Sequence, residues 1–277
     1  MGDLITMDDL TNEEILQVLD NARKLLPVAK GDVYLPLLQG KVLGNLFFEN
    51  STRTRMSFET AMKRLGGEVL NLSSIGSSVA KGETLYDTMQ MVDGYADIAV
   101  IRHPNQGAAQ YSADAVNIPI LNGGDGAGNH PTQTMLDLFT IREAHGSLEG
   151  LHVMMVGDLR YGRTTHSLSH ALVRFGAKIT LVSPESLRMP DEIVSDLKNH
   201  GGEINETEEM SSSIDSADVI YMTRIQKERF PDEDEYTKVA GIYKLIEDDL
   251  SSAKAGMIVM HPLPRVNELH ALSLIHI

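Results

Sequence analysis

The sequence predicts an α/β protein that consists of two doubly wound parallel-sheet domains joined by a long helix. Short apolar runs of strand length alternate with amphipathic segments of helical length along the 277 residues, and this alternation is typical of βαβ units. The pattern occurs twice, once before and once after a helical stretch at Pro131–His145. A chain of this length is also expected to hold about two domains.

The first set of elements begins with a helix after Thr11. Thr11 and Glu14 have the spacing of a capping box, and apolar residues follow them at helical intervals. A second helix is expected to end at Gly66, and a third to cover Glu83–Gly94. The expected strands of this set are the apolar runs Val42–Phe48, Val69–Leu72, Ile98–Ile101 and Ile118–Leu121.

The second set follows the helix at Pro131–His145, which opens with a proline, a residue that suits the first helical turn. The expected strands of this set are Val153–Val156, Ile179–Val182, Val219–Met222 and Ile258–Met260. The expected helices are Arg163–Phe175, Asp191–His200 and Met210–Ala217. We therefore divide the chain into domains 1–131 and 132–277.

The composition excludes several classes of protein. The chain has 24 Lys and Arg residues against 39 Asp and Glu residues, a formal net charge of −15. A chain this acidic is a poor general ligand for nucleic acid or an anionic membrane, because both attract positive charge. The start of the sequence lacks a signal-peptide pattern, and no apolar run is long enough to span a bilayer. We therefore expect a soluble, cytoplasmic protein without nucleic-acid or membrane partners.

A metal site is not expected either. The chain has no cysteine, which excludes disulfides, thiolate metal sites and cysteine nucleophiles. His166 and His170 lie four residues apart on an expected helix and could ligate a metal together. They lack the glutamate of an H-E-x-x-H motif, so we expect no metal there.

Polar clusters follow the expected strands, at the strand ends where open parallel sheets bind ligands. Ser51, Thr52, Arg53 and Thr54 lie at a strand-to-helix turn, where free backbone N–H groups and the helix dipole favour an anion. A helix N-cap beside a surface arginine would give the same pattern. His130 precedes a helix after a glycine-rich run, so it either contacts a ligand or caps that helix.

Several cationic side chains also follow strands in this acidic chain. If the strands share one polarity, these charges converge on one cleft suited to ligands with several negative charges. The residues concerned are Arg53, Lys81, Arg102, Arg163 and Arg224.

The motifs formed by these residues resemble those of the aspartate/ornithine carbamoyltransferase family. The run 47–55, Phe-Phe-Glu-Asn-Ser-Thr-Arg-Thr-Arg, resembles the family's carbamoyl-phosphate signature, and segments 81–84, 102–104 and 130–133 resemble later family motifs in the same order. Segments 157–164, 221–229 and 261–266 resemble the branch that uses aspartate. The ornithine branch typically carries H-C-L-P near the last segment, and this chain has no cysteine.

The resemblance implies a role for each matching residue. Ser51, Thr52, Arg53 and Thr54 would bind the phosphate of carbamoyl phosphate, with Ser77 and Lys81 from a neighbouring subunit. The carbonyl oxygen would be contacted by Thr54, Arg102 and His130, and the carbamoyl amine by Gln133 and the backbone carbonyls of Pro262 and Leu263. The carboxylates of aspartate would be bound by Arg163, Arg224 and Gln226. Thr54, Lys81, Arg102 and His130 would be the catalytic residues.

The resemblance thus implies an enzyme that transfers a carbamoyl group from carbamoyl phosphate to the α-amine of L-aspartate, in pyrimidine synthesis, without a cofactor. Domain 1–131 would bind carbamoyl phosphate and domain 132–277 would bind aspartate. A homotrimer with shared active sites is implied, and a regulatory chain is a possible partner. Two alternatives stay open: a carbamoyltransferase for another amine such as ornithine, and a non-catalytic ligand-binding or assembly homologue.

The last residues depart from the family pattern. After Glu268 the sequence does not resemble the acidic loop and C-terminal helix of family members. We therefore expect a truncated or foreign end after about residue 268, and a first domain that lacks its covering helix.

Overall fold

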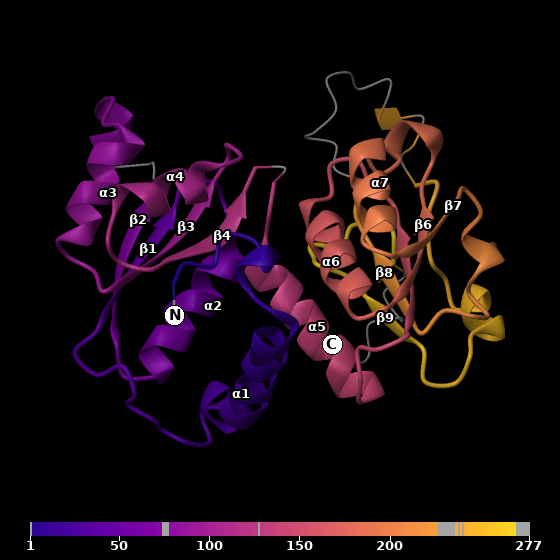
Figure 1. Ribbon diagram of the computed structural model, residues 1–277, viewed down its shortest axis with the longest axis horizontal. Coiled ribbons are helices and arrows are strands. Elements are labelled where there is room, and N and C mark those ends of the chain that lie inside the picture. The colour runs from indigo at the N-terminus through magenta and orange to yellow at the C-terminus, as the bar shows by residue number, and fades with distance from the viewer. Residues whose placement is uncertain are drawn as a thin grey trace. The chain divides into compact units, whose positions relative to one another are not determined.

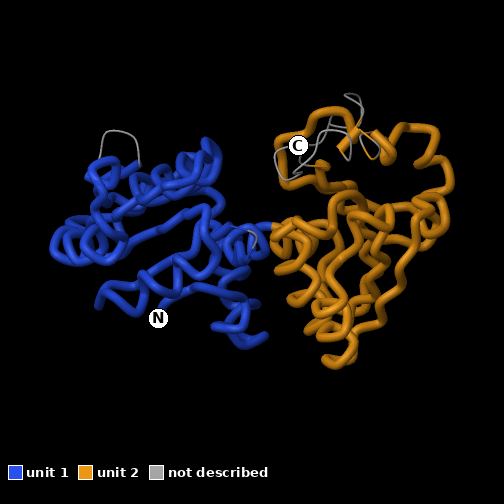
Figure 2. The backbone as a smooth tube through the Cα atoms, turned by 90° about the horizontal axis from the view of Figure 1, so that it is seen from above, with its two compact units in different colours: residues 1–136 blue, residues 137–277 orange. Residues whose placement is uncertain are grey.

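The computed structural model describes residues 2–73, 78–126, 128–225, 236–237, 239 and 241–269. The chain divides into two compact units, residues 1–136 and residues 137–277 (Figure 1 and Figure 2). The division falls inside helix α5 (Pro131–His145), which begins and ends where the sequence predicts. Each unit is an α/β domain with one parallel sheet, so the predicted fold class is confirmed.

The first unit contains a four-stranded parallel sheet in the order β2-β1-β3-β4. Its strands are β1 (Val42–Phe47), β2 (Glu68–Ser73), β3 (Ile98–His103) and β4 (Ile120–Asp125). Its α-helices before α5 are α1 (Asn12–Lys30), α2 (Thr52–Arg64), α3 (Leu85–Asp93) and α4 (Ala108–Ala115). The short 3₁₀ helices η1 (Met7–Asp9) and η2 (Ser78–Lys81) complete the unit.

Apolar side chains cover both faces of this sheet, as expected for parallel strands. Leu46 and Ile101 of β1 and β3 pack on one face with Met89 of α3 and Ala109 of α4. On the opposite face, neighbouring residues of the same strands pack with Met62 of α2. The alternation of side chains along each strand thus lets α2 pack on one face and α3 and α4 on the other, which makes the sheet doubly wound (Figure 1).

Helix α1 begins where its capping box predicts. The Thr11 hydroxyl accepts a hydrogen bond from the Glu14 N–H, and the Glu14 carboxylate accepts one from the Thr11 N–H. These reciprocal bonds satisfy two N–H groups that would otherwise lack a partner in the first turn. The helix ends at Gly31, which adopts the left-handed conformation (φ 85°) that glycine tolerates best.

The second unit contains a five-stranded parallel sheet in the order β7-β6-β5-β8-β9. Its strands are β5 (His152–Val156), β6 (Lys178–Val182), β7 (Glu203–Thr207), β8 (Val219–Met222) and β9 (Ile258–Met260). Its α-helices include α6 (Arg163–Arg174) and α7 (Asp191–Asn199), and its 3₁₀ helices include η3 (Glu185–Leu187), η4 (Met210–Ser212) and η6 (Asp248–Ser252).

The core of the second unit also has two sides. On one face, Met154 of β5 and Ile220 of β8 pack against Leu245 and Leu269 from irregular segments. Helices α6 and α7 lie on the other face (Figure 1). The Tyr221 hydroxyl of β8 donates a buried hydrogen bond of 2.8 Å to Asp137 Oδ2 of α5, which ties the C-terminal part of α5 to this sheet.

Two details of the second unit differ from the sequence-based prediction. The helix predicted over Met210–Ala217 is wrong in extent: η4 covers only three residues, and turns follow it. The Ser212 and Ser216 hydroxyls donate to the backbone carbonyls of Glu209 and Ser213, and such local bonds compete with a regular helix. The acidic edge strand β7 was not predicted, because its sequence lacks an apolar run.

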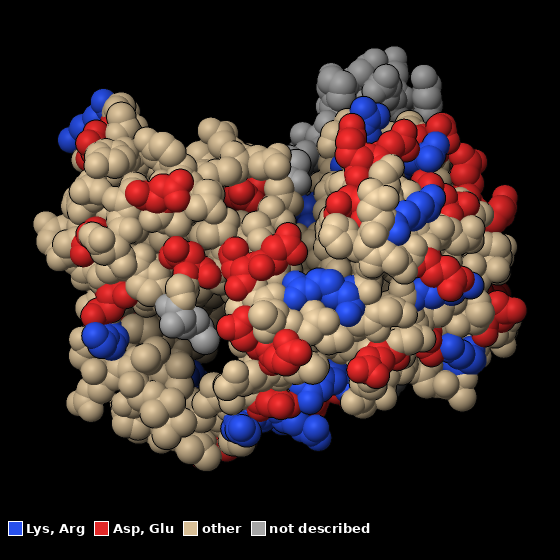
Figure 3. Space-filling model, in the orientation of Figure 1, with Lys and Arg blue, Asp and Glu red and all other residues tan. Residues whose placement is uncertain are grey.

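Charged side chains of both signs are interspersed on the face drawn in Figure 3, and Asp and Glu are spread over both units. Within the described part of the chain, no helix combines the length and apolarity needed to cross a bilayer. The acid-rich segment 228–235 and the tail 270–277 lie outside the described residues.

Candidate active site

Each sheet has one topological switch point, where chain connections leave neighbouring strands in opposite directions. In the first unit it lies between β1 and β3, and in the second between β5 and β8. Ligands of open α/β sheets bind beyond the carboxyl ends of the strands at such points. The residues at and after the ends of these four strands are therefore the candidate ligand-binding residues of each unit.

The N-terminus of α2 follows β1 and is built to attract an anion. Ser51 is the N-cap residue, but its hydroxyl makes no capping hydrogen bond, and the first turn contains no acidic side chain. The first N–H groups of an α-helix have no intrahelical partner, and the helix dipole adds partial positive charge there. Thr52 and Arg53 are exposed, and Thr54 is half-buried. Hydroxyl, guanidinium and backbone N–H donors are thus gathered at one helix end.

Arg102 lies near the end of β3, the neighbour of β1, and its guanidinium is held by several contacts. Its side chain is largely buried, with Nη1 donating to the Gly123 carbonyl at 3.1 Å and Nη2 paired with Glu49 Oε1 at 3.4 Å. Nη1 also lies 3.5 Å from His130 Nε2. The register of the sheet places Arg102 opposite Phe47, so this cluster adjoins the segment that leads to Ser51. The structure therefore brings Arg102 and His130 together beside the anion site.

His130 lies at the start of α5. Its backbone carbonyl accepts the first hydrogen bonds of the helix, from the Gln133 and Thr134 N–H groups at 3.0 and 3.1 Å. The imidazole is buried, with 5% of the residue exposed, and its Nδ1 lies 3.4 Å from the Thr132 hydroxyl. The ring thus lies between Arg102 and the first turn of α5. Gln133 is half-buried in the first turn of the same helix.

Asp125 shapes the glycine-rich loop that carries His130, and the sequence analysis missed it. Its buried carboxylate accepts hydrogen bonds from the Gly107 and Asn129 N–H groups at 2.8 and 2.7 Å, and from Asn122 Nδ2 at 3.2 Å. Gly126 has a φ of 55°, and a Cβ there would approach the Pro104 carbonyl to 2.5 Å. The only sequence signal for this role is a lone acid among glycines.

The remaining first-unit residues are not joined to this cluster by any described contact. Lys81 is exposed at the end of η2. Ser77 lies outside the described residues.

In the second unit, the segments that follow β5 and β8 lie side by side. The Thr223 N–H donates to the Val156 carbonyl at 2.8 Å, and a Cβ at Gly157 (φ 119°) would approach the Thr223 carbonyl to 2.4 Å. Only glycine permits so close an approach in this conformation. Arg224 follows Thr223 directly, and Arg163 begins α6 after the β5 turn. Both arginines are half-buried at this edge, whereas Gln226 lies outside the described residues.

The loop after β9 has an unusual backbone. Leu263 has a φ of 60°, a left-handed conformation that is rare for a branched side chain. Its N–H donates to His261 Nδ1 at 2.8 Å, and His261 Nε2 lies 2.8 Å from Glu268 Oε1. Pro262 and Leu263, which lie between His261 and Glu268 in the sequence, are half-buried. Glu268 is a second functional candidate that the sequence analysis missed.

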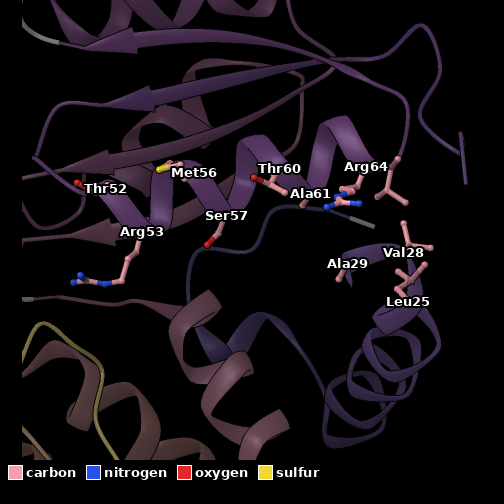
Figure 4. Close-up of a pocket in the computed structure, with 11 residues that line it drawn as sticks. Leu25, Val28, Ala29, Thr52, Arg53, Met56, Ser57, Thr60, Ala61 and Arg64 are labelled. Carbon is pink, nitrogen blue, oxygen red and sulfur yellow. The ribbon is translucent and has the colours of Figure 1, made fainter. Parts of the chain in front are cut away.

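A cavity of about 550 Å³ lies elsewhere in the first unit, between α1 and α2. Thr52 and Arg53 border it at the start of α2, and Ala61 and Arg64 border it near the end of that helix, facing Leu25, Val28 and Ala29 of α1 (Figure 4). Ser51, Thr54, Arg102 and His130 are not among its lining residues. The strand ends, rather than this cavity, therefore define the candidate site.

The two histidines considered as a metal pair make separate contacts. His166 Nε2 donates to the Leu159 carbonyl at 2.7 Å, and burial lowers the pKa of His166. His170 Nδ1 instead lies 3.4 Å from Asp196 Oδ2. Among the described residues, no three His, Cys, Asp or Glu side chains are grouped as metal ligands.

Comparisons with known proteins show which family the chain resembles. The family model for the carbamoyl-P binding domain of aspartate/ornithine carbamoyltransferases matches residues 2–143, and the model for the Asp/Orn binding domain matches residues 149–272. A curated relative from Archaeoglobus fulgidus, an aspartate carbamoyltransferase catalytic subunit, is 54% identical over 271 residues, covering 98% of this chain and 89% of that relative.

Solved structures give the same result. The catalytic subunit of Methanocaldococcus jannaschii aspartate transcarbamoylase superposes with a TM-score of 0.90 at 49% identity, covering 99% of this chain and 89% of that one. Aspartate transcarbamoylase from Trypanosoma cruzi, in complex with carbamoyl phosphate and aspartate, gives a TM-score of 0.92 at 39% identity, covering 98% and 88%. On the basis of its sequence motifs, its fold and these matches, the chain belongs to the aspartate/ornithine carbamoyltransferase family.

Proposed function

We propose that this protein transfers the carbamoyl group of carbamoyl phosphate to the α-amine of L-aspartate, giving N-carbamoyl-L-aspartate and phosphate in pyrimidine biosynthesis. The main supporting observation is the placement of an anion-binding helix end beside the Arg102–His130 cluster at one switch point, with two arginines at the other. Solved relatives from Trypanosoma cruzi contain carbamoyl phosphate and aspartate together, which supports the same pair of substrates here.

The first unit would bind carbamoyl phosphate through its phosphate group. The Ser51, Thr52 and Thr54 hydroxyls, the N–H groups of the first turn of α2 and the Arg53 guanidinium are donors suited to phosphate oxygens. Because no acidic side chain lies in that turn, nothing within it repels the dianion. Ser77 and Lys81 are proposed to complete this subsite from a neighbouring subunit.

The carbamoyl carbonyl would face Arg102. As the amine attacks, negative charge develops on the carbonyl oxygen, and fixed donors stabilise that charge better than water does. Glu49 and the Gly123 carbonyl hold the Arg102 guanidinium in place before substrate arrives. Arg102 and His130 nitrogens 3.5 Å apart are close enough to contact one oxygen atom together, with the Thr54 hydroxyl as a third donor.

The second unit would select the acceptor amine. Arg163 and Arg224, with Gln226, are proposed to bind the two carboxylates of aspartate, since a guanidinium matches a carboxylate in both charge and shape. Ornithine carries a cationic side chain, which these arginines would repel. Charge thus favours aspartate over the ornithine alternative.

The proposed reaction needs no covalent enzyme intermediate. The uncharged α-amine of aspartate attacks the carbamoyl carbon, a C–N bond forms, and the bond from that carbon to the phosphate oxygen breaks. The leaving phosphate accepts the proton that the amine loses. The side-chain oxygen of Gln133 and the carbonyls of Pro262 and Leu263 would accept hydrogen bonds from the carbamoyl amine and so orient the group. Orientation of two bound substrates supplies a large part of the rate enhancement in such reactions.

A homotrimer with shared active sites and a cytoplasmic location are part of this proposal. The relatives are named catalytic subunits, which supports assembly with further chains, including a regulatory one. The mass of the purified protein in solution tests the trimer.

An assay with two acceptors tests the function. The purified chain is incubated with carbamoyl phosphate and either aspartate or ornithine, and carbamoylaspartate and citrulline are measured. We expect carbamoylaspartate alone. Citrulline would support the ornithine alternative. Binding of N-(phosphonacetyl)-L-aspartic acid, a ligand of a solved Trypanosoma cruzi relative, without turnover would support the non-catalytic alternative.

A further inference from the structure

We propose that His261 and Glu268 form a positioning pair, which fixes the loop after β9 so that the Pro262 and Leu263 carbonyls face the carbamoyl amine. This inference rests on the proposed function, because it names the residues that orient one of its subsites. Neither side chain is suggested to contact substrate.

The loop is anchored at both ends but has little regular structure between them. At one end, β9 pairs with β8 up to Met260. At the other, the Leu245 N–H donates to the Glu268 carbonyl at 2.9 Å, and Leu269 forms a bridge with Leu245. Between these anchors, the N–H groups of Leu263, Val266 and Asn267 donate to two side chains, those of His261 and Glu268.

The hydrogen bonds determine the tautomer of His261. A backbone N–H can only donate, so His261 Nδ1 accepts from the Leu263 N–H at 2.8 Å. The ring proton must then lie on Nε2, which donates to Glu268 Oε1 at 2.8 Å. The His261 side chain is only 2% exposed and the Glu268 side chain 10% exposed. The imidazole is thus held by one partner on each nitrogen and cannot rotate without breaking both bonds.

Glu268 is held as a carboxylate. Burial alone would raise the pKa of Glu268, but hydrogen bonds from His261 and from the N–H groups of Glu268, Val266 and Asn267 outweigh it and lower this pKa to about 2. The Val266 N–H lies 3.1 Å from both carboxylate oxygens, and the Asn267 N–H lies 2.9 Å from Oε2. Glu268 therefore organises the second half of the loop while it orients His261.

The orientation of the Pro262 carbonyl follows from peptide geometry. In a trans peptide, the carbonyl of one residue and the N–H of the next point in opposite directions. Because His261 draws the Leu263 N–H toward itself, the Pro262 carbonyl must point away from His261. Within the described part of the chain, neither the Pro262 nor the Leu263 carbonyl accepts a backbone hydrogen bond, so both have lone pairs to offer to an N–H donor. The left-handed φ of Leu263 is a conformation that persists only where surrounding contacts enforce it.

Matched variants separate positioning from general stability. His261→Gln keeps a donor that reaches Glu268 but loses the acceptor for Leu263, whereas His261→Asn keeps an acceptor near Leu263 and loses the bond to Glu268. Glu268→Gln keeps the shape of the side chain without its charge. We expect His261→Gln and Glu268→Gln to lower kcat about tenfold or more, with a smaller loss in His261→Asn. His200→Gln, at an exposed helix end, is the control and should keep wild-type kcat.

Two ligands test which subsite is affected. Carbamoyl phosphate carries the amine that the carbonyls bind, whereas inorganic phosphate does not. In calorimetry, His261→Gln should weaken binding of carbamoyl phosphate about tenfold and leave binding of inorganic phosphate unchanged. Equal weakening of both ligands, or wild-type kcat in both Gln variants, would overturn the positioning role.

A spectroscopic measurement separates failure of this inference from failure of the proposed function. The ¹⁵N shifts of His261, assigned with the His261→Asn variant, should show a neutral ring with the proton on Nε2 at neutral pH. An imidazolium, or a proton on Nδ1, would refute the pair whether or not the protein is active. If the wild-type protein makes no carbamoylaspartate, the proposed function fails, and the subsite role with it, while the spectrum still decides the geometry.

Discussion

Arg102 and His130, 28 residues apart in the chain, meet with Nη1 and Nε2 3.5 Å apart at the carboxyl edge of the first sheet. Arg102 comes from the end of β3 and His130 from the glycine-rich loop after β4. Neighbouring parallel strands end at the same edge of a sheet, so polar residues from two distant segments of the chain lie close together there. The candidate site is a consequence of this topology.

Replacement of Arg102 by lysine should impair the chemical step. Lysine keeps the positive charge but cannot bind Glu49, the Gly123 carbonyl and an oxyanion at once. We expect kcat to fall about 100-fold, about 2.7 kcal/mol of transition-state stabilisation. Steady-state kinetics measure the effect, and Arg23→Lys on the exposed side of α1 is the control. A variant with near-normal kcat would contradict the assigned role.

Arg53→Ala should weaken the phosphate subsite. Loss of one charge-assisted hydrogen bond costs about 2 kcal/mol, about 30-fold in affinity. Calorimetry with inorganic phosphate measures this loss without any dependence on turnover. Arg64→Ala, at the other end of α2, removes the same charge far from the helix N-terminus and should leave the affinity unchanged. Similar losses in both variants would point to net charge instead of a local site.

Arg224→Gln should affect the acceptor substrate. We expect the KM for aspartate to rise about 30-fold, because a desolvated ion pair is replaced by a neutral contact, while the affinity for carbamoyl phosphate stays the same. Arg188→Gln, which removes an arginine paired with Glu206 outside the site, is the matched control. If carbamoyl phosphate binding fails instead, Arg224 has been assigned to the wrong substrate.

Glu268 should make stability depend on pH in the acid range. Its pKa is lowered from 4.5 to about 2 in the folded protein, so the unfolded chain binds its proton more readily. This group therefore contributes stability above pH 4.5, and the contribution is lost as the pH falls from about 4.5 to about 2. The difference corresponds to about 3 kcal/mol.

Urea unfolding of the wild type and Glu268→Gln at several pH values measures this contribution. The gap between their free energies of unfolding should be constant near neutral pH and shrink below about pH 4.5. A gap that is independent of pH would show that the Glu268 charge is not involved.

Much of the fold could be predicted because its signals are local. The apolar runs at β1, β5 and β8, the capping box of α1 and the proline that opens α5 each depend on a few neighbouring residues. The serine-rich segment at 210–217 misled the prediction, because its hydroxyls bind nearby carbonyls and a periodic pattern does not reveal this competition. Helix α4 was missed because its buried face consists of small residues such as Ala108, Ala109 and Ser112.

The residues of the candidate site could be predicted only in part. Ser51, Arg53 and Arg102 could be placed at strand ends from the sequence. The roles of Glu49, Asp125 and Glu268 depend on contacts across the fold or on the path of an irregular loop. In a chain of charge −15, the presence of an acidic residue does not by itself indicate a role. The sequence therefore indicated the groups that we propose to face a ligand better than the groups that hold them in place.

The most direct test of this account is the product formed by the purified protein from carbamoyl phosphate and aspartate. We predict carbamoylaspartate and phosphate in equal amounts, with no citrulline when ornithine replaces aspartate, and loss of product in Arg102→Lys. Hydrolysis of carbamoyl phosphate without carbamoylaspartate, or undiminished product in Arg102→Lys, would contradict the central claim that the Arg102–His130 cluster directs carbamoyl transfer.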